Sequence, residues 1–238
     1  MLKRLFKKET VKCGAVIVAA GSSNRMQGTD KIMALLHQEP LIIHTVRAFQ
    51  ENPLVHEIVL VTREDLLTPI SQLCQKKNFD KVTMVVTGGQ TRPQSVMRGL
   101  DHLSKDITHA AIHDGARPLV GQEVITNAME AAQKFHAAAP AIPVKDTIKV
   151  AVNHIVTKTP DRSTLMAIQT PQVFDFDLLR GALQKAIEEE LPITDDCSAV
   201  EAIGMSVYLS QGSDENIKVT TPVDLVLAEA IINNRRQV

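Results

Sequence analysis

Hydrophobic and polar residues form blocks of two kinds along the chain. Short runs rich in Val and Ile, several without polar alternation, recur between longer amphipathic stretches. Runs of the first kind are typical of strands buried on both faces, and amphipathic stretches are typical of the helices that cover them. The predicted strands are 15–20, 57–62, 82–86, 110–113, 137–144, 148–152, 155–157 and 207–209. The predicted helices are 40–51, 64–77, 92–104, 121–136, 176–189, 195–203 and 222–234.

The order of these elements predicts the fold class. Alternation of strands and helices over most of the chain indicates an α/β fold with a Rossmann-like, doubly wound and mostly parallel sheet. Residues 146–160 break the alternation, because two short strands with Lys and Thr at alternate positions flank Asn153 and His154. Such a hairpin has too little apolar surface to form a domain. We predict one domain over 13–238, with 146–160 as an arm that projects from the sheet and packs on a partner subunit.

The composition narrows the possible partners. The chain has 238 residues, of which 44% are hydrophobic and 22% charged, a balance that argues against disorder. A formal net charge of -1 gives no field that would attract nucleic acid or an anionic membrane, and one Tyr with no Trp leaves few platforms for stacking bases. We therefore expect neither nucleic acid nor membrane as a partner.

Cysteine usage and the N-terminus predict a cytoplasmic protein. The three cysteines are scattered without a CxxC spacing, which fits reduced thiols better than disulfides or a zinc site. Residues 1–12 begin with a basic stretch that no apolar segment or cleavage site follows, so they are interpreted as a flexible basic tail and not as a signal peptide. No apolar run approaches the ~18 residues that span a bilayer.

The loop after the first predicted strand is a candidate phosphate site. Ligands of open α/β sheets bind at the carboxyl ends of the strands, and residues 19–31 (AAGSSNRMQGTDK) form a small, polar loop there. The loop lacks the glycine spacing of a Walker A or a GxGxxG motif. Its cations Arg25 and Lys31 suit a nucleoside triphosphate attacked at its α-phosphorus, because fixed cations stabilise the charge of that transition state. A solvated surface loop is the alternative.

Two further strand ends carry candidate chemistry. Gly88 and Gly89 would let the backbone approach a base or ribose closely, although a helix-capping turn explains them equally well. Asp114 and Arg117 could hold a Mg²⁺–phosphate assembly and an anionic substrate, or could pair with one another. His113 is predicted to be a packed strand residue.

Later segments add cations and hydroxyl groups beside strand or arm ends. These segments are 145–147 (KDT), 159–162 (TPDR) and 215–220 (ENIKVT). Residues 194–198 (TDDCS) are interpreted first as a helix N-terminus capped by Thr194, with a metal role less favoured.

Taken together, the loops resemble the 2-C-methyl-D-erythritol 4-phosphate cytidylyltransferase family of the non-mevalonate isoprenoid pathway. The resemblance covers residues 15 to about 232. Each motif alone is weak, but their order and spacing are specific. The motifs are AAGSSNRM…DK at 19–31, GGQTRPQSV at 88–96, HDGARPL at 113–119, PVKDTIK at 143–149, TPDRSTLMAIQTPQVF at 159–174, TDDCSAVE at 194–201 and ENIKVTTPVDL at 215–225.

The resemblance implies transfer of CMP from CTP to methylerythritol phosphate with release of pyrophosphate, in the presence of Mg²⁺ or another divalent cation. Arg25 and Lys31 match the pair that stabilises the transition state, and Arg162 and Lys218 match the pair that positions the acceptor. Further substrate positions match Asp114, Arg117 and Thr147. Positions around the nucleotide match Ala19, Ala20, Gly21, Gly88, Gly89, Gln90, Arg92, Ser95 and Gly115. The motifs assign no protein ligand to the metal.

The resemblance also implies a homodimer in which the arm is exchanged, so that Thr147 and Arg162 serve the neighbouring site. The sequence departs from the family at Ser22-Ser23, where a second glycine is usual, and at Gln90, where an acid often contacts the ribose. Both departures concern CTP affinity. A ribitol 5-phosphate cytidylyltransferase is the nearest alternative, and a non-catalytic nucleotide-binding module is a more distant one.

Overall fold

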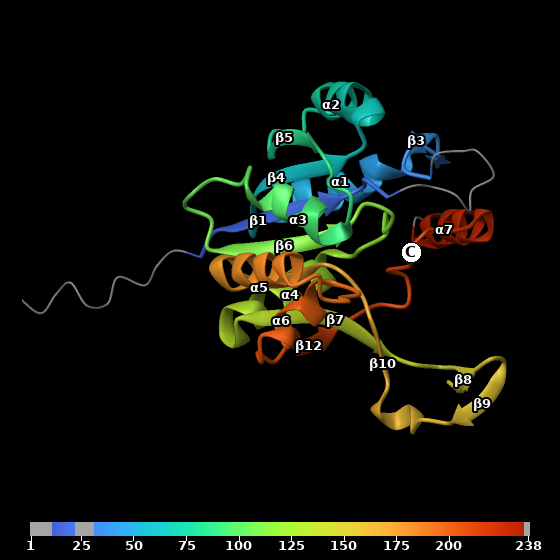
Figure 1. Cartoon of the computed structure of the whole chain (residues 1–238). Helices are drawn as coiled ribbons and strands as arrows, with labels where there is room; N and C mark the ends of the chain where they lie inside the picture. The colour runs from blue at the N-terminus through green and yellow to red at the C-terminus, as the bar shows by residue number, and fades with distance from the viewer. Residues whose placement is uncertain (1–10, 22–30, 236–238) are drawn as a thin grey trace, which may run out of the picture.

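One mixed sheet forms the centre of the molecule and carries helices on both faces (Figure 1). The computed structural model describes residues 11–21 and 31–235. The sheet has the order β10-β7-β11-β6-β1-β4-β5, and β12 pairs with β7. Its strands are β1 (Cys13–Val18), β4 (Val55–Thr62), β5 (Val82–Thr87), β6 (His109–Asp114), β7 (Ala137–Pro143), β10 (Met166–Ile168), β11 (Gln172–Asp175) and β12 (Tyr208–Gln211).

Most of the strands run in one direction, as the sequence predicts. β1 pairs in parallel with β4 and β6, β4 with β5, and β7 with β12. The exceptions are β11, which lies antiparallel between β6 and β7, and β10, which is antiparallel to β7. The fold class predicted from the alternation is therefore confirmed, with two antiparallel strands inserted on one side of β6.

The helices divide between the two faces because side chains of each strand alternate between them. Ala15 and Ile17 of β1 belong to one buried cluster with α1, α2 and α4, whereas Val16 belongs to the other with α3, α5 and α6. A smaller third cluster lies under α7 and includes Leu119 and Val219. The helices are α1 (Leu41–Glu51), α2 (Leu67–Lys76), α3 (Arg92–Leu100), α4 (Gln122–Phe135), α5 (Phe176–Glu188), α6 (Asp196–Ala202) and α7 (Pro222–Arg235).

Several predicted boundaries shift in ways that affect the site. The first strand ends at Val18, so Ala19 and Ala20 belong to the loop. The predicted helix 64–77 opens as a 3₁₀ turn (Glu64–Leu66), and the predicted helix 92–104 ends at Leu100. β10, β11 and the short pair β2 (Leu35–Leu36) and β3 (Glu39–Pro40) were not predicted as strands.

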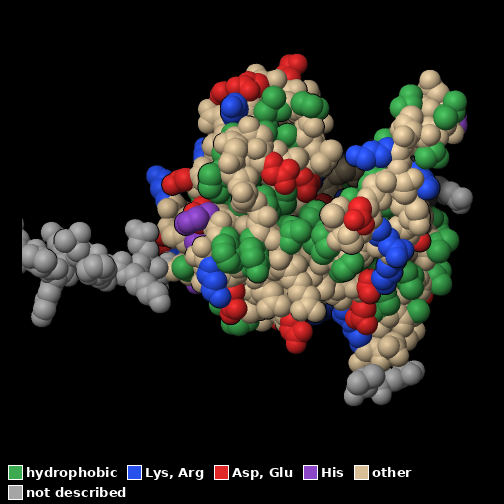
Figure 2. Space-filling model, turned by 90° about the horizontal axis from the view of Figure 1, so that it is seen from below, with side chains coloured by type: hydrophobic (Ala, Val, Ile, Leu, Met, Phe, Trp, Pro, Cys, Tyr) green, Lys and Arg blue, Asp and Glu red, His purple; other side chains and the backbone are tan. Residues whose placement is uncertain are grey.

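The segment predicted to be an arm forms a hairpin of β8 (Val150–Val152) and β9 (Ile155–Lys158). Asn153 and His154 both have positive φ, 48° and 64°, as a two-residue hairpin turn requires. The hairpin projects from the body of the protein (Figure 1), and hydrophobic side chains surround its tip (Figure 2). Ile155 is 70% exposed and Val152 is 59% exposed.

The folded domain begins before residue 13. The Lys12 amide donates to the Thr108 hydroxyl at 3.0 Å, and the Lys12 carbonyl accepts from the amides of Thr108 and His109. Lys12 is thus bound to the residues at the start of β6. Residues 1–10 of the predicted tail lie outside the described residues.

Candidate active site

A cavity of about 210 Å³ lies at the carboxyl ends of β1 and β6 and the N-terminus of α3. Its wall combines the loop after β1, the start of α3, the end of β6 and one residue shortly before α7. The lining residues are Val18, Ala19, Ala20, Gly21, Lys31, Ile32, Gly89, Gln90, Thr91, Arg92, Ser95, Asp114, Ala116 and Lys218. The cavity thus brings together segments that the sequence analysis identified separately.

Backbone hydrogen bonds tie the loops around this cavity to neighbouring strands. The Ala19 amide donates to the Val61 carbonyl at 2.7 Å, and the Gly115 amide donates to the Val18 carbonyl at 2.8 Å. The Gly88 amide likewise donates to the Thr62 carbonyl at 2.8 Å. The loops that follow β1, β5 and β6 are therefore anchored to the carboxyl ends of β1 and β4.

Gly88 and Gly115 lie directly behind the lining. A Cβ at Gly88 would overlap the Cβ of Ala20 and lie 2.9 Å from the Ser95 Oγ. A Cβ at Gly115 would lie 2.9 Å from the Cβ of Ala19. Both glycines serve close packing of the cavity wall.

We expect Gly88→Ala to lower the free energy of unfolding by about 1–3 kcal/mol and to weaken CTP binding, because the added methyl group displaces Ala20. Thermal unfolding and a titration with CTP measure the two effects. Gly181→Ala is the matched control: an added Cβ there has no heavy atom within 4 Å. This control in α5 should be neutral or stabilising by up to about 1 kcal/mol. Equal behaviour of the two variants would contradict the packing role of Gly88.

Asp114 is the centre of the site's electrostatics. Its carboxylate lies 2.8 Å from Lys218 Nζ, 3.6 Å from Arg117 Nε and 3.9 Å from Arg92 Nη2. Burial alone raises the pKa of Asp114, but Lys218, Arg92 and Arg117 together outweigh it and lower the pKa to about 2. The Asp114–Arg117 pair foreseen as an alternative thus exists, within a larger cluster of three cations around one carboxylate.

His113 fixes the turn that presents this carboxylate. It is fully buried, and its ring centroid lies 4.8 Å from that of Phe49. Nε2 is 3.1 Å from the Arg117 carbonyl, which can only accept, so Nε2 carries the proton and Nδ1 accepts from the Thr170 hydroxyl at 2.9 Å. The same hydroxyl accepts from the Asp114 amide at 3.2 Å. The prediction of a packed strand residue is confirmed.

The stability of the protein should fall between about pH 6.5 and pH 4. Burial lowers the pKa of His113 to about 4, so the unfolded chain takes up this proton first as the pH falls. Neutral His113 stabilises the fold fully above pH 6.5, the ordinary pKa of histidine. Between pH 6.5 and pH 4 the free energy of unfolding should fall by about 3 kcal/mol in all. Urea unfolding of His113→Gln between pH 7 and pH 4.5 should show a shallower loss than the parent chain. The exposed control His102→Gln should not, and an unchanged slope in His113→Gln would refute the assignment.

The segment before α7 is anchored beside Asp114. Asn216 is fully buried and donates to the Thr170 carbonyl at 2.8 Å, and Arg117 Nη1 donates to the Asn216 carbonyl at 2.6 Å. The Val219 amide donates to the Ala116 carbonyl at 2.8 Å. These contacts on both sides of Lys218 hold its ammonium group at the cavity.

Arg92 joins the cavity to a buried acid that the sequence did not single out for this purpose. Its Nη2 lies 2.7 Å from Oδ2 of Asp196, which has no exposed surface.

The helix N-terminus predicted around residues 194–198 is confirmed, but the expected Thr194 cap is wrong. The Asp195 carboxylate accepts from the Ser198 amide, and the Ser198 hydroxyl completes the capping box.

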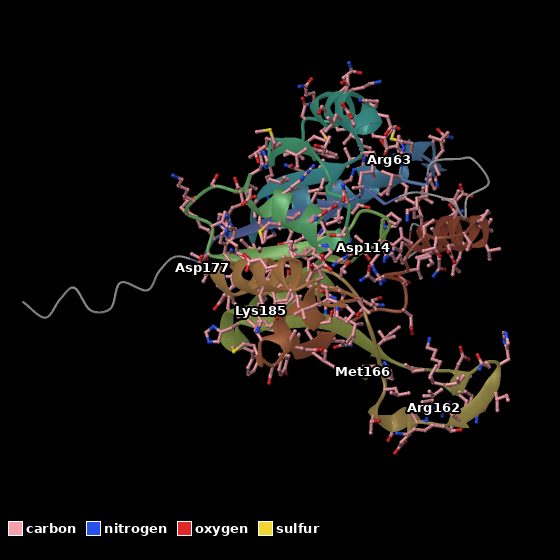
Figure 3. The ribbon with its side chains drawn as sticks, in the orientation of Figure 1. Arg63, Asp114, Arg162, Met166, Asp177 and Lys185 are labelled. Carbon is pink, nitrogen blue, oxygen red and sulfur yellow. The ribbon has the colours of Figure 1, made fainter. Side chains whose placement is uncertain are left out.

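Two predicted residues lie away from this cavity. Arg162 is exposed in the 3₁₀ turn Arg162–Thr164, which belongs to the projecting arm (Figure 3) although it lies beyond the predicted end at residue 160. Its Nη1 donates to the Lys145 carbonyl at 2.8 Å, and Thr147 is exposed at the root of the arm. Figure 3 places Arg162 far along the arm from Asp114. Within one chain, neither residue meets the cluster around Asp114. Arg25 lies outside the described residues.

Some neighbours of the site were missed by the sequence analysis. Ile32, Thr91 and Ala116 line the cavity, and Thr170 lies directly behind Asp114. Thr91, Ala116 and Thr170 belong to recognised motifs and Ile32 directly follows one, but only the tertiary contacts identify these residues as neighbours of the site. Within the described residues no group of three or more His, Cys, Asp or Glu side chains is arranged to hold a metal ion, and no helix is long and apolar enough to cross a membrane.

A larger surface depression of about 1240 Å³ lies at the opposite edge of the sheet, between Lys12, His109 and Arg180. It contains none of the residues selected from the sequence. The cationic cavity at the carboxyl ends of the strands is therefore the candidate active site.

Comparison with known proteins identifies the family of the chain. The sequence profile of the family 2-C-methyl-D-erythritol 4-phosphate cytidylyltransferase matches residues 13–234. Proteins of that name from Dehalococcoides mccartyi and Desulforamulus reducens are 43% and 45% identical to the chain over 226 and 225 residues. The matches cover 94% and 93% of this chain and 98% and 96% of the relatives.

Solved structures give the same result. The 4-diphosphocytidyl-2C-methyl-D-erythritol synthase of Anaerococcus prevotii superimposes with a TM-score of 0.84 at 29% identity, over 94% of this chain and 99% of that one. The 2-C-methyl-D-erythritol 4-phosphate cytidylyltransferase of Thermus thermophilus gives 0.76 at 31% identity, over 92% and 98%. The chain therefore belongs to the 2-C-methyl-D-erythritol 4-phosphate cytidylyltransferase family.

Proposed function

We propose that the cavity beside Asp114 is the place where this enzyme transfers CMP from CTP to 2-C-methyl-D-erythritol 4-phosphate, giving 4-diphosphocytidyl-2-C-methyl-D-erythritol and pyrophosphate. The observation that carries the proposal is the meeting of Lys31, Arg92 and Lys218 in one small cavity at the carboxyl edge of the sheet. Three cations in one cavity suit a reaction in which both substrates carry negatively charged phosphate groups.

The reaction needs no activated protein nucleophile. A phosphate monoester has a second pKa of about 6, so the acceptor is mostly ionised at neutral pH. One of its oxygens attacks the α-phosphorus of CTP in line, and the bond to the bridging oxygen of the β-phosphate breaks as pyrophosphate leaves. The nearby imidazole of His113 is not available as a general base, which fits a reaction that needs none. His113 is fully buried, and its two nitrogens are hydrogen-bonded to the Arg117 carbonyl and the Thr170 hydroxyl.

We assign roles to the cations by position. Lys31 stabilises the charge that develops on the α-phosphoryl oxygens. Arg25, which lies outside the described residues, is given the same role by the resemblance to the family. Lys218 positions the acceptor phosphate. Asp114 is its counter-ion, since the Lys218 Nζ lies 2.8 Å from the carboxylate. Gly89, Gln90, Arg92 and Ser95 surround the cytidine part of CTP.

Mg²⁺ enters this scheme as part of the CTP complex. Asp114 is the one carboxylate among the described lining residues, and three cations already contact it, which makes it a poor metal ligand. Mg²⁺ commonly binds through substrate phosphates while keeping several waters. We therefore infer that Mg²⁺ would be bound together with CTP and would neutralise charge on the leaving group.

We further propose a homodimer that exchanges its arms. The isolated two-stranded hairpin is marginal by itself, and its exposed Val152, Ile155 and Val156 offer an apolar surface to a second chain. In such a dimer Thr147 and Arg162 reach the site of the partner. A cytoplasmic location fits the three cysteines, which are all unpaired and buried.

Pyrophosphate release tests the proposed function. The protein is incubated with CTP and Mg²⁺ and either methylerythritol phosphate or ribitol 5-phosphate, with EDTA as the metal control. Release that requires both the branched acceptor and the metal is expected. Release with ribitol 5-phosphate alone would retain the mechanism but change the acceptor. No release with either, from folded protein that binds CTP, would contradict the function.

A further inference from the structure

The buried position of the Asp196 side chain is not needed to form or cap α6. It occupies the first residue of the helix, yet Asp195 already provides the cap through its 2.9 Å contact with the Ser198 amide. The Asp196 side chain has no exposed surface. An acid that merely favoured the helix N-terminus would be equally effective in contact with water. The inward orientation therefore needs another explanation.

Arg92 supplies the compensating charge. Its Nη2 is 2.7 Å from Asp196 Oδ2, while neither carboxylate oxygen has a well-aligned hydrogen bond from any described residue. A buried carboxylate is tolerated only beside a cation, so the pair is held together by the cost of leaving either charge alone. Arg92 at the same time lines the cavity, with 29% of its side chain exposed.

The backbone that carries the Asp196 carboxylate is held by a side chain of the sheet. Gln172 of β11 accepts through Oε1 from the amides of Asp196 at 3.0 Å and Cys197 at 3.2 Å. Its Nε2 donates to Asp195 Oδ2 at 2.7 Å. A strand inserted between β6 and β7 thus fixes the first turn of α6, and that turn fixes the charge facing Arg92.

The alternative partner of Arg92 lies close by. The same Nη2 is 3.9 Å from Asp114, the carboxylate that also contacts Lys218 and Arg117. Without Asp196, Arg92 would turn toward Asp114 and compete with Lys218 for it. Asp196 therefore keeps the guanidinium of Arg92 at 3.9 Å from Asp114 and leaves the closer contact, at 2.8 Å, to Lys218.

We propose that Asp196 is a positioning residue for CTP: its buried carboxylate, on a helix turn whose backbone is held by Gln172, keeps the guanidinium of Arg92 in the orientation that contacts the nucleotide. This inference rests on the nucleotide-binding role given to Arg92 under the proposed function. It concerns how that role is maintained.

A double-mutant cycle on CTP affinity tests the proposal. The dissociation constant of CTP with Mg²⁺ is measured by calorimetry, without acceptor, for the parent chain, Asp196→Asn, Arg92→Gln and the double variant. Each single variant should bind about tenfold more weakly, as expected for one misplaced charge-assisted contact. The double variant should bind within about twofold of Arg92→Gln, because the two residues act as a unit.

Glu201→Gln is the matched control in the same helix. It neutralises an exposed carboxylate of α6 by the same kind of substitution, so CTP affinity should change less than about twofold. An equal loss of affinity in this control would overturn the proposal, because the negative charge of α6 would then matter and not the buried Asp196 carboxylate. Unchanged affinity in Asp196→Asn, or an undiminished effect of that substitution in the Arg92→Gln background, would also overturn it.

Two further results keep the test decisive. If Asp196→Asn does not fold, Gln172→Met releases the same turn and should weaken CTP binding about threefold, but only where Arg92 is present; no change would refute the inference. If Arg92→Gln binds CTP normally, the proposed nucleotide role of Arg92 has failed. That outcome differs from a failure confined to Asp196.

Discussion

Lys31→Ala is expected to reduce kcat by about 10²–10³, the loss typical of removing one group that stabilises charge only in the transition state. Lys31 lines the cavity together with Arg92 and Lys218, so the remaining cations should still bind CTP. The dissociation constant of CTP should therefore change much less than the rate. Single-turnover pyrophosphate release and a CTP titration separate the two quantities.

Lys134→Ala is the matched control for this substitution. Lys134 is exposed near the end of α4 and is not among the residues that line the cavity, so its removal should leave kcat unchanged. Near-parental turnover in Lys31→Ala would show that this cation has no part in the transition state. A rise in the dissociation constant of CTP as large as the fall in rate would assign Lys31 to ground-state binding.

Mixing two inactive variants should restore activity. Arg162→Ala removes a cation from the arm, and Lys218→Ala removes one from the cavity, so each homodimer should lose about 10²-fold or more. In a mixed dimer with exchanged arms, one site receives the intact Lys218 of one chain and the intact Arg162 of the other. Random exchange of equal amounts makes half of the dimers mixed, which should return about a quarter of parental activity.

The complementation has a clear contrary outcome. If each arm serves its own chain, every site in the mixture lacks one cation and activity stays at the level of the single variants. Co-expression of the two chains with different affinity tags isolates the mixed dimer and removes any dependence on slow subunit exchange. A second mixture, of Arg162→Ala with Thr147→Ala, is the matched control. Both substitutions lie on the arm, so each site of that mixed dimer still has one defective arm.

Much of the fold follows from the sequence because its strongest signals are long. Buried runs such as Val55–Thr62 and amphipathic stretches such as Gln122–Phe135 contain enough residues to show their period. Met166–Ile168 and Gln172–Asp175 are three and four residues long, and Gln169-Thr170-Pro171 separates them. Segments this short lack a readable pattern, so both antiparallel strands were missed.

The sequence likewise predicted part of the candidate site. Residues in loops directly after strands, such as Lys31 and Arg92, were found because strand ends meet at one edge of the sheet. The contact between Arg92 and Asp196 was not found, since it depends on how α6 packs beside α3 through α5. Asp196 looks like an ordinary helix-start acid in the sequence, and only its burial reveals the pairing.

The insertion of β11 has a consequence for biosynthesis. β10, β11 and β12, the strands that pair with β7, all follow it in the chain, and the arm is translated before any of them. On the ribosome, β1, β4, β5 and β6 can assemble as soon as they emerge. Residues Ala137–Pro143 must wait as an unpaired apolar segment while the hairpin is made. Unpaired strands of this kind are where nascent chains associate wrongly or recruit chaperones. The arm that we propose to be exchanged in the dimer thus lengthens the time for which β7 stays unpaired during synthesis of the enzyme.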